Sequence, residues 1–152
     1  MSLLSRYRIG LMAISAAALL SACARQDPDE LVASAQAQID RQDLNAAIIE
    51  LKNALEVRPD HAIARMMLGK ALFESGQTTA AAVEFEKALE LGLQPDVVIP
   101  LLAKARLRDE EFRKVVELDA RSRLDSPGAR ASVNASLAQA LAELGEEARA
   151  QQ

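Results

Sequence analysis

The sequence contains few of the residues on which most metal and redox sites depend. Among its 152 residues there is one Cys, Cys23, and one His, His61, with one Tyr and no Trp. A single thiol excludes an intrachain disulfide, a thiolate metal cluster and a Cys-x-x-Cys redox pair. The helical neighbours of His61 are Ala64 and Arg65, so a solvated cap or turn position is favoured over a metal ligand. We therefore expect no metal and no cofactor.

Catalytic motifs are also missing. None of the patterns GxGxxG, GxxxxGK[ST], HExxH and GxSxG occurs. The adjacent carboxylates Glu110-Glu111 and Glu146-Glu147 would point about 100° apart on a helix, which does not place either pair as an acid–base couple. Acidic residues in a first helical turn are favourable without any function. We expect a protein that is not an enzyme.

The chain is poor in the residues that favour sheets. Aromatic residues make up 3% of it, whereas hydrophobic residues of all kinds make up 50%, mainly as Ala and Leu. Ala and Leu are strong helix formers, and sheets prefer β-branched and aromatic side chains. Small residues also let helices approach closely. The composition predicts an all-α fold of packed helices.

A run long enough to span a membrane is missing, but a shorter apolar run opens the chain. Arg6 and Arg8 precede residues 9–20, which are apolar except for Gly10 and Ser15. A transmembrane helix needs roughly 20 apolar residues, whereas a basic start, a short apolar run and small exit residues are typical of a secretory signal peptide. We predict that residues 1–22 are a signal peptide that is removed.

The apolar run ends in LSAC, which resembles a bacterial lipobox. Its residues are Leu20, Ser21, Ala22 and Cys23. Because the chain's one Cys falls at the position that receives diacylglycerol, lipidation is favoured over an ordinary signal peptide with an incidental Cys. Residues 23–27 would then be a lipidated tether, and the resemblance implies several acyl chains, which anchor durably. Ala24 rather than Asp follows, which by resemblance to lipoproteins of bacteria with two membranes favours the periplasmic face of the outer membrane.

The charge balance argues against a nucleic-acid partner. Removing residues 1–22 takes Arg6 and Arg8 from a chain of formal net charge −4, which leaves about −6. Proteins that bind DNA or RNA present a basic face, often with aromatic side chains for stacking. The mature chain has neither feature. We expect no nucleic-acid partner.

The sequence is rich in a repeated pattern of small and large apolar residues. Residues 28–61 and 62–95 align at a period of about 34 residues. The matched pairs are Ala35 with Gly69, Ala47 with Ala81, Leu51 with Phe85, and Ala54 with Ala88. Gly76 separates two helices within the second stretch, and Pro59 closes the first stretch. The pattern resembles the tetratricopeptide repeat (TPR), which implies a superhelix of stacked antiparallel helix pairs.

The register divides the chain into four units. The first repeat, 28–61, should contain helices at about 28–41 and 44–57, and the second repeat is 62–95. A third repeat, 96–126, is degenerate because Asp119 and Ser122 replace Phe85 and Ala88, and its Pro100 is acceptable only in a first turn. An incomplete fourth repeat, 127–152, should turn at residues 144–145. We expect either the beginning of a longer array or a truncated copy, since no polar capping helix is visible.

The first helices of such repeats line a concave groove, where we place the candidate binding residues. They are Val32, Gln36 and Ile39; Met66, Lys70 and Phe73; Pro100, Lys104 and Leu107; and Ala135, Gln139 and Ala142. Lys70 and Lys104 would stand about 10 Å apart on neighbouring helices and could bind carboxylates of an extended peptide. TPR modules that clamp a C-terminal carboxylate use Lys and Asn at two groove positions, and Val32, Met66 and Pro100 do not support that clamp. The alternative is that both lysines are simply solvated.

Four stretches carry a narrower resemblance. They are AAIIELKNAL at 46–55, ARMMLGKALFESG at 64–76, EFEKALELG at 84–92 and PLLAKARL at 100–107. Together they resemble the start of the TPR-repeat lipoprotein of PEP-CTERM/exosortase systems. That resemblance implies a scaffold in exopolysaccharide export and the sorting of PEP-CTERM proteins, with a protein or peptide partner in the groove and no small-molecule substrate. The sequence departs from the family at Glu110, where such repeats usually have a turn Gly.

Two other interpretations are compatible with the sequence. A pilotin-like lipoprotein, or another helper in outer-membrane assembly, would escort one specific envelope component. An enzyme whose catalytic domain follows Gln152 would reveal itself in downstream sequence. Neighbouring genes distinguish the first two classes: exosortase and polysaccharide genes favour the scaffold, and secretin or pilus genes favour the helper.

Overall fold

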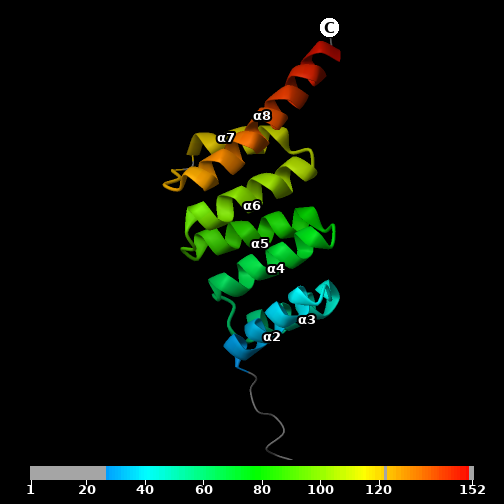
Figure 1. Ribbon diagram of the computed structural model, residues 1–152, viewed down its shortest axis with the longest axis vertical. Helices are drawn as coiled ribbons and strands as arrows, with labels where there is room; N and C mark the ends of the chain where they lie inside the picture. Colours follow the sequence, from blue (N-terminus) through cyan, green and yellow to red (C-terminus); the bar gives the residue numbers. More distant parts are fainter. Residues whose placement is uncertain (1–26, 122, 151–152) are drawn as a thin grey trace, which may run out of the picture.

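The computed structural model describes residues 27–121 and 123–150, and within them the regular secondary structure is entirely helical. The helices are α2 (Pro28–Asp40), α3 (Leu44–Val57), α4 (Ala62–Glu74), α5 (Thr78–Glu90), α6 (Pro95–Arg108), α7 (Phe112–Arg121) and α8 (Pro127–Ala150). Successive helices stack along the long axis of the molecule (Figure 1). The predicted lipobox, from Leu20 to Cys23, lies outside the described residues.

The first two helices begin where the sequence supplies a capping side chain. Asp27 caps α2, with its side chain accepting a hydrogen bond from the Asp29 N–H and Pro28 at the first helical position. The Asp43 side chain caps α3 by accepting from the N–H of Ala46. The first two helices therefore end and begin close to the predicted bounds of 28–41 and 44–57.

Each turn inside a helix pair contains one residue with a left-handed backbone. Gln42 has φ 64°, Gly76 has φ 85° and Glu110 has φ 59°. These residues follow one another at the repeat period of about 34 residues. Glu110 thus adopts the conformation of the turn Gly that it replaces, so this departure in sequence leaves the turn unchanged.

The core is built from small residues interleaved with larger aliphatic side chains and one aromatic ring. Fully buried residues include Ala35, Ala47, Leu51, Ala54, Ala64, Ala71, Ala81, Ala88, Val98, Ala103 and Val115, each 0% exposed. Phe85 (1%) is the largest fully buried side chain, followed by Leu51 (0%) and Leu102 (1%). Matched positions of successive repeats are therefore buried alike.

The C-terminal part of the stack differs from the prediction in two ways. Pro100 lies inside α6 rather than in its first turn, because the helix already begins at Pro95. Since Pro has no backbone N–H, the helix lacks the hydrogen bond from residue 100 to the carbonyl group four residues earlier. α8 runs through Gly145 without the turn expected at 144–145. Residues 146–150 have the sequence EEARA, which consists of strong helix formers, so continuing the helix is favoured despite about 1 kcal/mol for the Gly.

Helix α8 covers the end of the third pair. It packs on both α6 and α7, and α6 shares more contact with α5 and α8 than with α7. Figure 1 shows α8 projecting beyond α7 toward the C-terminus. In the described residues no helix has the length and apolar character needed to cross a membrane.

Candidate functional site

Three first helices meet around a surface hollow of about 450 Å³. Phe73 comes from α4, Lys104, Leu107 and Arg108 come from α6, and Gln139 comes from α8. The sequence placed four of these residues, all except Arg108, in the groove. These four residues therefore line one hollow on the first helices.

Phe73 and Arg108 form the organised part of this hollow. The guanidinium carbon of Arg108 lies 4.3 Å from the centre of the Phe73 ring, a cation–π distance. Nη1 of Arg108 also donates a hydrogen bond to the carbonyl oxygen of Phe73 at 3.3 Å. Arg108 thus joins α6 to the end of α4 while its positive charge stays free of any carboxylate partner in the described part of the chain.

Lys104 and Lys70 are exposed on the same set of helices. Neither forms an ion pair with a carboxylate in residues 27–121 and 123–150. Lys104 lines the hollow, whereas Lys70 does not. The hollow therefore combines an apolar wall, Phe73 and Leu107, with two unpaired cations, Lys104 and Arg108.

The other predicted groove residues lie elsewhere. Gln36 is exposed, and its amide nitrogen donates to Oδ1 of Asp40 at 2.8 Å. Ile39 and Met66 are half-buried and pack against the hydrophobic core. The structure does not bring these three side chains into the hollow.

Sequence reasoning missed Arg108. A signal for it was present, since Arg108 follows Lys104 by four residues on the same helix, and residues four apart are neighbours on a helical surface. The repeat pattern assigned only one cation per first helix to the groove. The structure adds a second cation through its contact with Phe73.

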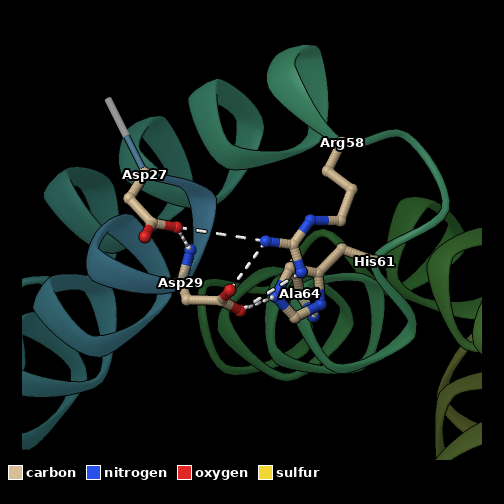
Figure 2. Close-up of polar contacts among 5 residues, drawn as sticks. All are labelled: Asp27, Asp29, Arg58, His61 and Ala64. Atoms are coloured by element: carbon tan, nitrogen blue, oxygen red, sulfur yellow. Dashed lines mark hydrogen bonds and ion pairs between the residues drawn. The ribbon is translucent and has the colours of Figure 1, made fainter. Parts of the chain in front are cut away.

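A polar cluster fixes the first helix pair to the second (Figure 2). The Asp29 carboxylate accepts from Nη2 of Arg58 at 2.7 Å and from Nη1 at 3.3 Å, and it also lies 3.0 Å from Nε2 of His61. The hydrogen bond from Arg58, helped by that from His61, lowers the pKa of Asp29. The hydrogen bond with Asp29 raises the pKa of Arg58. These contacts connect the start of α2 with the connection between α3 and α4.

His61 is a buried cap and not the solvated residue that the sequence suggested. It is 8% exposed, and Nδ1 accepts a hydrogen bond from the N–H of Ala64 at 3.4 Å. With Nδ1 as acceptor, Nε2 carries the proton and donates to Asp29. His61 is enclosed because it caps α4 and contacts α2 at the same time. Among the described residues no group of His, Cys, Asp and Glu side chains could hold a metal ion.

Comparison with known proteins agrees with this geometry. Residues 38–105 match the family model of the tetratricopeptide repeat. The crystal structure of the Sgt2 TPR domain from Aspergillus fumigatus is similar, with a TM-score of 0.60 and 21% sequence identity over 82% of this chain and 83% of that chain. The fold is that of a TPR domain.

The TPR fold accounts for the period and for the paired helices, as predicted from the sequence. A search of curated protein sequences finds no match to the chain. TPR domains are in general scaffolds that bind proteins or peptides rather than catalysts. The hollow between α4, α6 and α8 is therefore the candidate site for a protein partner.

Proposed function

We propose that this protein is a scaffold that binds a segment of a partner protein in the hollow between α4, α6 and α8. One observation carries the proposal: an apolar wall and two cations without carboxylate partners share one hollow of about 450 Å³. The apolar wall would take an aliphatic or aromatic side chain. A carboxylate of the same segment would lie against Lys104 and Arg108, since charge-assisted hydrogen bonds are the stronger ones.

The test is a charge reversal with a matched control. The variant Lys104→Glu, which reverses a charge inside the hollow, should lose partner capture from a bacterial envelope extract, measured by affinity purification and mass spectrometry. Lys52→Glu is the control for a single reversal, because Lys52 is exposed on α3, outside the hollow. Unchanged capture by Lys104→Glu would overturn the proposal.

Membrane attachment is the second part of the proposal. The LSAC sequence ending at Cys23 supports cleavage before that residue and lipidation of its thiol. The protein would then be anchored to the bacterial envelope, at the periplasmic face of the outer membrane. Changing Cys23→Ser should move it from the membrane fraction to the soluble fraction, and retention in the membrane would refute attachment through this thiol.

The resemblance to lipoproteins of PEP-CTERM/exosortase systems indicates which envelope system the scaffold would serve. It rests on residues 46–55, 64–76, 84–92 and 100–107. We propose a role in assembling exopolysaccharide export or in sorting PEP-CTERM proteins. Exosortase and polysaccharide genes beside the coding sequence would support this role. Secretin or pilus genes in their place would support the pilotin-like alternative.

A further inference from the structure

A second hollow, of about 530 Å³, lies on the face formed by the second helices. It is bounded by α5 and α7 with α6 beneath them, and it shares no lining residue with the hollow of Phe73 and Lys104. Leu89, Leu102 and Leu118 provide its apolar lining, and Glu90 and Glu117 are exposed at it. This surface is separate from the proposed scaffold site.

An Arg lines this hollow at a position that is apolar and buried in the preceding repeat. Arg106 stands one repeat period after Leu72, which is 4% exposed and belongs to the core. The Arg106 side chain is 15% exposed and pairs with Glu86 of α5, while Nη1 donates to the carbonyl oxygen of Lys114 of α7 at 3.3 Å. Its Nε is buried without a hydrogen-bond partner. A buried donor without a partner is unfavourable for folding, so packing alone does not explain an Arg here.

The charges around this hollow determine which kind of ligand it can bind. Arg106 is neutralised by Glu86, and Lys114 is neutralised by Glu111. Neither Glu90 nor Glu117 forms an ion pair within residues 27–121 and 123–150. The charge that remains uncompensated at the hollow is therefore negative, opposite in sign to that of the hollow at Lys104.

We propose that the hollow between α5 and α7 binds a basic amphipathic segment of a partner protein. Apolar side chains of that segment contact Leu89 and Leu118, and its Lys or Arg side chains pair with Glu90 and Glu117. Complementary charge at the edge of an apolar surface fixes the orientation and excludes acidic segments. The two hollows would let one scaffold hold two segments of opposite charge.

Fluorescence anisotropy with two labelled synthetic peptides tests this proposal. Both are 18-residue amphipathic helices, one of Leu and Lys and the other of Leu and Glu, titrated with the full chain carrying Cys23→Ser. The Leu/Lys peptide should bind at least tenfold more tightly than the Leu/Glu peptide. Equal affinity for the two peptides, or no binding of the Leu/Lys peptide, would overturn the proposal.

Variants locate the binding. Glu90→Lys with Glu117→Lys should weaken Leu/Lys binding at least tenfold. The control is Glu30→Lys with Glu56→Lys, two exposed residues outside this hollow that give the same change in net charge; it should change affinity less than threefold. An equal loss in both double variants would show that only overall charge matters. Circular dichroism confirms that each variant is folded. Lys104→Glu, in the other hollow, should change the affinity for the Leu/Lys peptide less than threefold. A marked gain in affinity there would place the peptide in the other hollow and overturn the proposal.

Discussion

A Cβ atom added to Gly69 would lie 2.6 Å from Cε1 and 2.7 Å from Cδ1 of Phe85. The ring of α5 therefore packs directly on the backbone of α4. One period earlier the matched residues are Ala35 and Leu51, both fully buried. The two repeats fill matched positions in different ways: the second pairs Gly with the large Phe, and the first pairs Ala with the smaller Leu.

This relationship predicts strong coupling between Gly69 and Phe85. Gly69→Ala should lower the free energy of unfolding by about 1–3 kcal/mol, because the added methyl group overpacks the ring. In the double variant Gly69→Ala, Phe85→Leu, which reproduces the first repeat, the loss should be smaller than the sum of the two single losses by at least about 0.5 kcal/mol. Urea denaturation of the four proteins measures this difference. Additive losses would show that the close approach does not decide the packing.

The sequence predicts those parts of the fold that depend on repetition. Small residues at the positions of Ala35 and Gly69 recur with the period, so helix pairing could be predicted without any contact being known. The uninterrupted helix α8 could not be predicted in this way, because a Gly ends a helix only when the following residues gain more by packing elsewhere. Arg108 and Arg106 were missed for another reason: their roles come from contacts with Phe73 and Glu86 on other helices, and a pattern within one helix does not contain them.

The left-handed turn residues predict a gain in stability. Glu110 has φ 59°, a conformation that costs a residue with a Cβ atom roughly 1–2 kcal/mol and costs Gly little. Glu110→Gly should raise the free energy of unfolding by up to about 1 kcal/mol, after the greater freedom of Gly in the unfolded chain is subtracted. The reverse change, Gly76→Ala, should lower it. Thermal denaturation of both variants checks the signs, and a destabilised Glu110→Gly protein would contradict the account.

The lowered pKa of Asp29 predicts a dependence of stability on pH. A carboxyl group whose pKa is lower in the folded protein than in the unfolded chain stabilises the fold above its unfolded pKa of about 4, and this contribution disappears as pH falls through the folded pKa. Wild type should therefore exceed Asp29→Asn in melting temperature at pH 7. The difference should shrink below about pH 4 and vanish once Asp29 is protonated in the folded state.

Thermal denaturation followed by circular dichroism from pH 7 to pH 2 measures this difference. Asp125→Asn is a suitable control, because Asp125 is exposed and donates a hydrogen bond to Asp96 through its backbone N–H rather than using its carboxylate. The control should show no comparable loss at pH 7. A melting-temperature difference for Asp29→Asn that persisted unchanged to pH 2 would show that the carboxylate's charge is not what holds α2 to Arg58.

A missing ion pair in the first repeat predicts a stabilising substitution. In the second repeat, Glu84 binds Arg65 at 2.8 Å and Lys87 at 2.9 Å. One period earlier stands Glu50, whose Oε2 is buried without a hydrogen-bond partner, because Leu31 and Asn53 occupy the positions of those two cations. Asn53→Lys should give Glu50 a partner three residues away on the same helix.

The expected gain is about 0.2–0.5 kcal/mol in the free energy of unfolding, the usual size for such a pair. Asn53→Gln is the matched control, since Gln and Lys have similar helix propensity and Gln brings no charge. Urea denaturation at low and high salt separates the two effects, because an exposed ion pair weakens with salt whereas helix propensity does not. If the gain of Asn53→Lys over Asn53→Gln also appeared in a Glu50→Gln background, the pairing between residues 50 and 53 would be refuted.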